Sequence, residues 1–449
     1  MKSVFDLKVF IQPVHIEYIY PWNPRDAPVA YTAWVKGPLK PREIIQRQEE
    51  PPKDTSLESL QKNGFIEILD RIVIRDPKDT KNISSEADAL IVSNDYFADY
   101  SITDAIASLG KPILPQWDRW GYSLWGRVSK FSFKRYSKVK RFIPMGDKDI
   151  LSILGGLIAW KSIKNLRILY IGDFPSHSVT LGDRVDFNYL NSRFGTETVQ
   201  IGFDEYIQTI NSLSEDEVRD IVDNWVESFV FLDGTDKKVA NYAKIYKSLK
   251  ILLEKYDANA ITVDCATLPG LEYVPCLAYS ILINEGIPCG CEADIPALYA
   301  MTMLMAISKK PVLMGNLNAN VTHVDIERNN IVVNHDIVPP YFACNNCKYY
   351  IRDYHETGKG STPYTDLING MDVTLTGLSW DLDMLWSTKG KVIWTMDTVH
   401  CRISIGIHVE NAKRVSREAK GHHVSLVYGD YVSELEKAAE LLDLEFRKL

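Results

Sequence analysis

The sequence predicts an α/β protein with two Rossmann-like parallel-sheet domains followed by a mostly β, barrel-like C-terminal domain. Three observations lead to this prediction. The chain has 449 residues, short apolar runs alternate with helical stretches as far as residue 318, and short alternating segments replace them afterwards. At ~100–200 residues per domain, such a chain divides into two to four domains. We place three domains at residues 1–163, 164–318 and 319–449.

The first domain contains one clear strand–helix–strand step. Residues 87–95 form an apolar run that ends in polar residues, which is typical of a buried parallel strand. A helix at 103–109 and a strand at 112–114 follow it. Four aromatic residues near the end of the domain are able to stack on a sugar face, although their spacing is more typical of a core: Trp117, Trp120, Tyr122 and Trp125.

The second domain opens with an apolar run that stops at Gly172, ahead of the polar residues 176–178. Parallel sheets bind ligands at such an edge. No GxGxxG motif follows the run, so a nucleotide-dependent enzyme is the weaker alternative. Further strands are predicted at 198–201, 260–263 and 310–314, and helices at 215–229, 237–256, 273–285 and 295–307.

The third domain is predicted to be mostly β. Turn residues such as Asn369-Gly370 and Lys389-Gly390 separate its short alternating segments, as in antiparallel sheets. The predicted strands are 331–334, 372–378, 391–395 and 423–427. An amphipathic helix at 431–442 closes the chain.

Composition excludes several classes of protein. The net charge of −8 does not fit a nucleic-acid-binding surface, and a local basic run is interpreted as a solvated or subunit-contacting face: Lys134, Arg135, Lys138, Lys140 and Arg141. No apolar stretch reaches ~18 residues, and the N-terminus lacks the pattern of a signal peptide. We therefore expect a cytoplasmic protein without membrane or nucleic-acid partners.

The seven cysteines are scattered through a long chain without a signal peptide, which favours reduced thiols over a disulfide framework. Cys344 and Cys347 form a single CxxC pair. A structural zinc site needs a second ligand pair of similar spacing, and none follows. The role of this pair stays open.

The most informative segment is residues 286–296, GIPCGCEADIP, followed by an apolar helix. Asp294 is suitably placed to cap that helix, which is a purely structural role. Capping does not account for Glu292, which lies two residues outside the helix in an apolar segment. Its carboxylate either makes a buried pair or points into a cleft, where it is able to ligate a metal or move a proton.

This segment resembles the L-fucose isomerase and L-arabinose isomerase family. The resemblance rests on Cys291-Glu292-Ala293-Asp294, on the run 310–316 (KPVLMGN) after the helix, and on the C-terminal run 421–430 (GHHVSLVYGD). Shorter similarities occur at 331–335 and 370–374. Specific matches cover roughly the last 290 residues, whereas the first domain matches only in its general α/β character.

The resemblance implies a site for Mn²⁺ or a similar divalent ion. In the fucose isomerases the glutamate of the motif binds the metal, which gives Glu292 that role. Their second ligand is an aspartate 24 residues further on, where this chain has Asn316. Their third ligand is a histidine of the C-terminal motif, for which His423 is favoured over His422. Carboxylates with one imidazole suit a fairly hard, octahedral ion.

The family's reaction is an aldose–ketose isomerisation of a small sugar through an ene-diol, with carboxylates moving the proton. Glu292 and Asp294 are the expected catalytic residues. Asn316 has an amide that coordinates without charge and exchanges no proton at neutral pH. The alternatives are therefore an isomerase in which another carboxylate substitutes, and a homologue that binds sugar with altered or lost activity.

Three further residues are expected near the substrate, namely Asn316, His335 and His422. His335 resembles a family histidine, although a lone strand-end histidine is often structural. His422 and His423 are neighbours, and because adjacent strand residues alternate faces, only one is expected to point inward. Glu272 either caps a helix or faces the cleft. The resemblance also implies a homo-oligomer, either a trimer or a hexamer.

Overall fold

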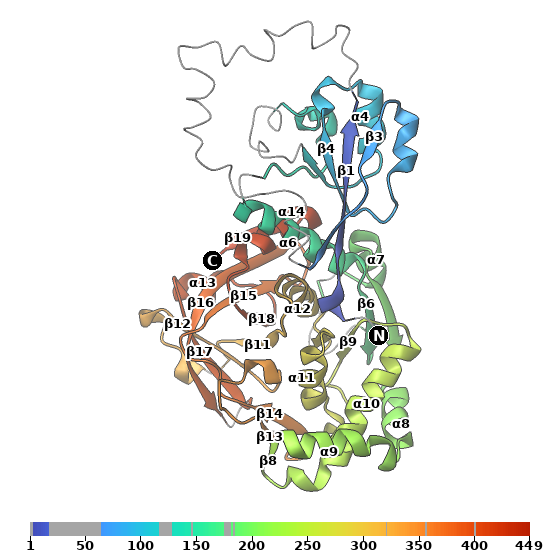
Figure 1. Ribbon diagram of the computed structural model, residues 1–449. Helices are drawn as coiled ribbons and strands as arrows, with labels where there is room; N and C mark the ends of the chain where they lie inside the picture. The colour runs from blue at the N-terminus through green and yellow to red at the C-terminus, as the bar shows by residue number, and fades with distance from the viewer. Residues whose placement is uncertain are drawn as a thin grey trace, which may run out of the picture. The chain divides into compact units, whose positions relative to one another are not determined.

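A computed structural model describes residues 3–17, 64–115, 128–144, 147–174, 181–182, 185–319, 321–354, 357–398 and 401–449 (Figure 1). The chain divides into two compact units, one of residues 8–154 and one of residues 1–7 with 155–449. The boundary predicted near residue 163 falls inside helix α6 (Asp147–Lys164). The further division near residue 318 stays a prediction, because both sides of it belong to the same compact unit.

The unit of residues 8–154 contains a five-stranded parallel sheet of order β2-β1-β4-β5, with β3 pairing beside β2 on β1. The strands are β1 (Val9–Ile16), β2 (Ile66–Ile68), β3 (Ile72–Ile74), β4 (Ala89–Ser93) and β5 (Ile113–Pro115). Helix α4 (Tyr100–Ala107) joins β4 to β5, as the sequence predicts. The four aromatic residues at 117–125 lie outside the described residues.

The second unit contains a four-stranded parallel sheet of order β10-β9-β6-β7. Its strands are β6 (Arg167–Ile171), β7 (Glu197–Ile201), β9 (Ala260–Val263) and β10 (Cys289–Gly290). Every residue of β9 is buried, because helices cover parallel sheets on both faces. The helices are α7 (Phe187–Phe194), α8 (Phe203–Ser212), α9 (Arg219–Ser228), α10 (Val239–Lys255), α11 (Cys276–Asn284) and α12 (Ile295–Ser308).

The C-terminal part forms a closed antiparallel barrel of six strands in the order β15-β18-β11-β12-β17-β16, closed by the pairing of β15 with β16. The strands are β11 (Leu313–Leu317), β12 (Asn330–His335), β15 (Asp372–Leu378), β16 (Met384–Asp397), β17 (Ile403–Val409) and β18 (His423–Tyr428). The amphipathic helix α14 (Val432–Leu442) and strand β19 (Glu445–Lys448), parallel to β16, end the chain. The predicted α/β and barrel-like fold class is confirmed.

The turn predicted at Lys389-Gly390 is wrong, because both residues lie inside the 14-residue strand β16. Gly390 is needed there for space, since a Cβ on it would contact Ile407 and the carbonyl of His408 on the neighbouring strand. A small fourth sheet of order β14-β13-β8 was also missed, with β8 (Val230–Phe231), β13 (Tyr350–Asp353) and β14 (Ser361–Tyr364). Its strands are too short to show a clear period.

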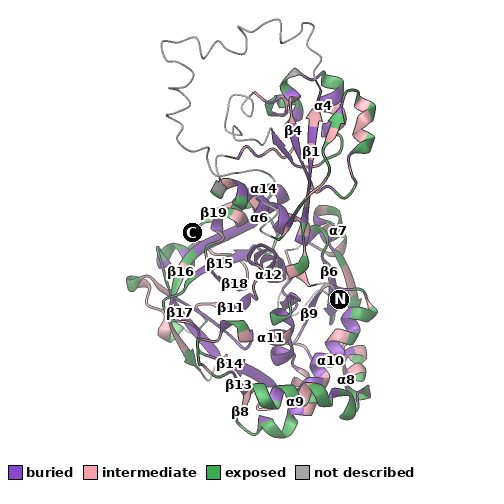
Figure 2. Cartoon of the chain, viewed as in Figure 1, coloured by how far each residue is buried: buried purple, intermediate pink, exposed green. Residues whose placement is uncertain are grey.

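Helix α12 is the element that positions the site. All fourteen of its residues are buried, as its uniform colour in Figure 2 shows. It packs on β18 and β15 of the barrel and on β10 of the parallel sheet, so it lies between the two layers (Figure 1). Its N-terminus therefore brings the loop after β10 to the barrel strands.

Two further features are settled by the fold. Cys344 and Cys347 form a disulfide, where the sequence predicted reduced thiols. A turn in which Cys347 N–H donates to the Cys344 carbonyl brings their Cα atoms to 5.1 Å, within bonding range. Among the helices that the structure describes, none is long and apolar enough to cross a membrane.

Candidate metal and sugar site

The loop between β10 and α12 holds Glu292 in an unusual backbone conformation. Glu292 and Ala293 both have positive φ, 53° and 57°, a region that L-residues seldom adopt and that surrounding contacts must hold. Ala293 N–H donates to the Val263 carbonyl at 3.2 Å, and Asp294 N–H donates to the Cys291 carbonyl at 3.0 Å. The first bond fixes the loop against β9, and the second closes the turn that contains both residues.

Asp294 connects the start of α12 to the barrel. Its Oδ1 accepts the N–H of Ala297 at 2.9 Å, which makes it the N-cap that the sequence predicted. Its Oδ2 accepts the backbone N–H of His423 at 3.2 Å and the ring Nδ1–H at 2.9 Å. Both side chains are fully buried. A carboxylate only accepts, so the His423 proton is on Nδ1 and Nε2 carries a lone pair.

That Nε2 atom is buried and has no hydrogen-bond partner within the described part of the chain. Buried polar atoms without a partner are rare in folded proteins and call for an explanation such as an ion. A histidine that donates one ring N–H to a carboxylate and keeps the other nitrogen bare has the arrangement typical of metal ligands. His423 therefore fits a metal-ligating role.

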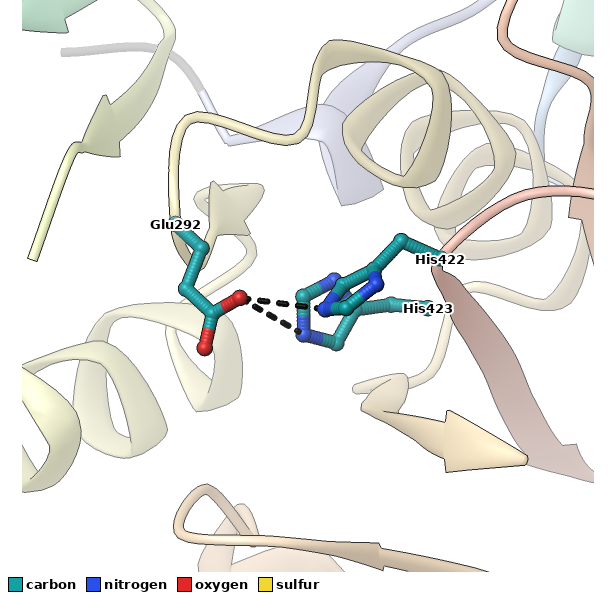
Figure 3. Close-up of side chains that lie close together, drawn as sticks. All are labelled: Glu292, His422 and His423. Atoms are coloured by element: carbon teal, nitrogen blue, oxygen red, sulfur yellow. Dashed lines mark hydrogen bonds and ion pairs between the residues drawn. The ribbon is translucent and has the colours of Figure 1, made fainter. Parts of the chain in front are cut away.

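Both histidines of the C-terminal motif turn toward Glu292 (Figure 3). Oε2 of Glu292 lies 3.1 Å from His422 Nε2 and 3.9 Å from His423 Nε2. The two differ in burial, since the His423 side chain is fully buried, whereas the His422 side chain is 38% exposed and precedes the first residue of β18. Strand alternation does not apply to His422, which follows Gly421 with φ of +97°.

The charges of Glu292 and His422 support each other. Burial works to raise the pKa of Glu292, but the hydrogen bond with His422 and the positive charge that His423 and His335 carry when protonated outweigh it and lower the pKa to about 2. The hydrogen bond to Glu292 in turn raises the pKa of His422. Glu292 is thus ionised at neutral pH, which is the state that a ligand or base requires.

Asn316 lies on β11 directly opposite Asn334 on β12 and His423 on β18. Its amide is 3.3 Å from His422 Nε2. That nitrogen cannot both donate to Glu292 and accept from an amide N–H. The structure places the Asn316 Nδ2 atom at this distance, so the ring nitrogen either accepts from the amide or donates to Glu292, and in the second case a rotation of the amide by 180° would bring Oδ1 to the ring.

His335 ends strand β12 and is buried. Its Nδ1 accepts the N–H of Asp336 at 2.8 Å, so Nε2 carries the ring proton. Burial and the nearby His423 lower its pKa to about 4, and its ring centre is 5.0 Å from that of His423. It is therefore a neutral donor at neutral pH beside the His423 ring.

The structure brings together the residues that the sequence singled out around Glu292. Within the described residues, the group of ligand side chains close enough to share a metal ion is Glu292, His422 and His423, whose ligand atoms all lie within 4.8 Å. Glu272 takes no part, since it is half exposed and pairs with Lys359 at 3.8 Å.

Sequence reasoning missed Asn334. Its two side-chain polar atoms are buried without a hydrogen-bond partner among the described residues. Only its cross-strand position opposite Asn316 relates it to the site, and a polar residue near a strand end carries no signal of that kind in sequence.

Comparison with known proteins finds similarity to L-arabinose isomerases. Residues 168–310 match the family model of the L-arabinose isomerase central domain. An L-arabinose isomerase of Halalkalibacterium halodurans is 28% identical over 151 residues, covering 32% of this chain and 30% of that protein. L-arabinose isomerase 2 of Clostridium acetobutylicum is 25% identical over 276 residues, covering 55% and 54%.

The matched region thus spans about half or less of these relatives' own length. The match to the central domain ends just after α12 and contains Glu292 and Asp294. It confirms the resemblance carried by the motif around Glu292. Over these segments, and at low sequence identity, this chain is similar to L-arabinose isomerases.

Proposed function

We propose that this chain is a sugar isomerase that interconverts an aldose and a ketose with the help of a divalent metal ion. The observation that carries the proposal is the bare, buried Nε2 of His423, held by Asp294 and aimed toward the Glu292 carboxylate. Its relatives are L-arabinose isomerases, which makes a small sugar the expected substrate.

The proposed metal ligands are Glu292, His423 and the Asn316 amide oxygen. This mixture of oxygen donors and imidazole favours Mn²⁺ or a similar ion. When bound, such an ion polarises the carbonyl and hydroxyl oxygens on C1 and C2 of the sugar. Asn316 leaves the site with one negative charge fewer than a carboxylate would, so we expect weaker binding than an aspartate would give.

The proton transfers are assigned to Glu292 and His422, which contact each other at 3.1 Å. Glu292 removes the proton from C2 of the aldose, the released electron pair forms the C1–C2 double bond, and O1 gains a proton to give an ene-diol. Return of a proton to C1, with loss of the proton on O2, gives the ketose. His422 is within hydrogen-bond distance of Glu292 and is the proposed proton donor to the sugar oxygen.

Two other residues support this chemistry without exchanging protons in our proposal. Asp294 was expected to be catalytic, but its oxygens are taken by Ala297 and His423, which suits a positioning role. His335 presents a neutral Nε2–H as a donor to a sugar hydroxyl. We also propose a homo-oligomer, a trimer or hexamer, for which light scattering is the direct test.

A second candidate function is sugar binding without efficient turnover, and Asn316 is the observation that favours it. An amide at this position coordinates but moves no proton. A protein of this kind would be stabilised by a sugar and would not convert it.

The test is Mn²⁺ binding by calorimetry together with isomerisation assays over a panel of aldoses. In Glu292→Gln we expect turnover to fall by about 10²–10⁴-fold, because the shape is kept while the charge and base are lost. Glu272→Gln is the matched control, since that glutamate is half exposed and pairs with Lys359. Undiminished turnover in Glu292→Gln would contradict the proposal, and sugar binding without turnover in the native chain would favour the second candidate.

A further inference from the structure

Two thiols lie in contact directly behind the Glu292 loop. Cys291 follows β10, and Cys265 lies two residues beyond the end of β9. These two strands are parallel neighbours, with Gly290 opposite Thr262, so their carboxyl ends meet at one edge of the sheet. The Sγ atoms of Cys265 and Cys291 are 3.4 Å apart.

We propose that Cys265 and Cys291 form a reversible oxidation site, in which a peroxide converts the two thiols to a disulfide that weakens the Glu292 metal site. The second half of this inference rests on the proposed function of that site. The pair is distinct from Cys344 and Cys347, which are already joined.

The accessibility of the two sulfurs sets the order of the steps. Cys265 is half-buried and Cys291 is buried, so a peroxide in solution meets Cys265 first. Its thiolate attacks one peroxide oxygen and the O–O bond breaks. Cys265 then carries a sulfenic acid, and the other peroxide oxygen takes up a proton and departs as water. The sulfur of Cys291 then attacks the Cys265 sulfur, the S–O bond breaks and a second water leaves. Two thiols and one hydrogen peroxide thus give one disulfide and two waters.

The bond requires only a short movement. A disulfide has an S–S distance of about 2 Å, so the sulfurs must approach by roughly 1.4 Å from their separation in the thiol form. A rotation about the Cα–Cβ bonds covers part of this, and the backbone at Cys265 and Cys291 must supply the remainder.

Movement at Cys291 reaches the metal site directly. Glu292 is the next residue, and its backbone and that of Ala293 are held at positive φ by contacts that include the bond from Asp294 N–H to the Cys291 carbonyl. Cys291 N–H also points to Met314 Sδ on barrel strand β11 at 3.4 Å. Because a displacement of about 1 Å in a reacting group can lower a rate about 10²-fold, a similar shift of Glu292 is enough to impair the site.

The experiment treats the full chain with hydrogen peroxide and maps its peptides by mass spectrometry without reduction. We expect a Cys265–Cys291 cross-link in the native chain and in Cys401→Ser, a control that alters another half-buried cysteine. No such cross-link should form in Cys265→Ser. A native chain in which Cys265 is oxidised without linking to Cys291 would overturn the site.

The link to the metal site has two readouts. After peroxide we expect Mn²⁺ affinity to fall about tenfold or more in the native chain, to recover with dithiothreitol, and to be unaffected in Cys265→Ser. Hydrogen exchange of the segment 289–298 should change in parallel, and it needs no metal. A cross-link that alters neither readout would overturn the coupling. A reduced chain that binds no Mn²⁺ would contradict the proposed function, while the peptide map and the exchange data would still decide on this inference.

Discussion

Asp294 accepts the Nδ1–H of His423 at 2.9 Å across 129 residues of sequence, and both side chains are fully buried. The same carboxylate caps helix α12 through Ala297 N–H. One residue therefore fixes both the start of the central helix and the orientation of an imidazole on barrel strand β18. This double role makes Asp294 the most sensitive position for a test of the site.

Asp294→Asn is expected to lower metal affinity about 10–100-fold, the range found when a carboxylate behind a ligating histidine is lost. An amide has only one acceptor oxygen, whereas Ala297 N–H and the His423 ring each need an acceptor at this position. When its NH₂ group faces His423, the ring moves its proton to Nε2 and loses the lone pair that a metal needs. Mn²⁺ titration measures the affinity, and thermal denaturation measures the folded state separately.

The matched control is Asp186→Asn, which changes the N-cap of α7, where Asp186 accepts from Tyr189 N–H at 2.7 Å on the surface. Asparagine caps helices about as well as aspartate, so this variant should retain both stability and metal affinity. Equal affinity in Asp294→Asn and Asp186→Asn would mean that the contact to His423 does not set the ligand.

Asn316→Asp tests whether the amide at the predicted ligand position limits the metal site. The added charge lies opposite His423 on the neighbouring strand and within 3.3 Å of His422. We expect Mn²⁺ affinity to rise about tenfold, equivalent to about 1.4 kcal/mol. Asn330→Asp is the control. Asn330 lies on β12, the strand that also holds His335, and its Oδ1 is 3.1 Å from Nδ1 of another histidine, His408 on β17. A similar gain in both variants would indicate a general charge effect.

Much of the barrel is predictable from sequence because its strands alternate in polarity. Strand β15 covers residues 372–378, as predicted. Strand β17 was missed although it pairs with both β12 and β16, and its Gly406 is one reason, since glycine is read as a strand breaker. In the structure this glycine lies opposite Trp394, whose indole ring occupies the space that a Cβ would need. A local pattern does not reveal a residue kept small for its cross-strand partner.

Some features of the candidate site are likewise predictable from the sequence, and others are not. Glu292 is recognisable because an acidic residue in an apolar loop lacks a local explanation, and the family motif adds His423. The contact between Asp294 and His423 is not recognisable, since helix capping already accounts for Asp294 in full. Nor is the contact of His422 with Glu292, which depends on where β18 begins. Periodicity assigns a residue to a face and does not name the partner that another element brings to it.

Lys309 gives the protein a stability that rises with pH above neutrality. It ends α12 at φ of 55° and its Nζ donates to the Leu7 carbonyl at 2.7 Å. Burial lowers its pKa to about 8, only partly opposed by Asp6. Between pH 8 and the ordinary value of 10.5, the unfolded chain keeps a proton that the folded chain has released, so the free energy of unfolding rises with pH.

Lys309→Met removes this titration. The stability of the native chain relative to Lys309→Met should therefore rise by about 1–3 kcal/mol between pH 8 and pH 10.5, a range reduced for solvent screening of the partly buried ammonium. Urea denaturation at several pH values measures the difference. A native chain that loses stability relative to the variant over this interval would reverse the sign and contradict the assignment.

Gly406→Ala tests how the barrel accommodates its long strand. Trp394 pairs with Gly406 next to the irregularity between Val392 and Trp394 of β16, and the indole covers the glycine. A methyl group there must displace the ring, which costs about 1–3 kcal/mol in a packed site. The midpoint of thermal denaturation should fall accordingly. In a Trp394→Leu background the same change should cost less, because the smaller side chain leaves space for the methyl group. Equal losses in both backgrounds would show that the strain comes from the backbone of β17 and not from the indole ring.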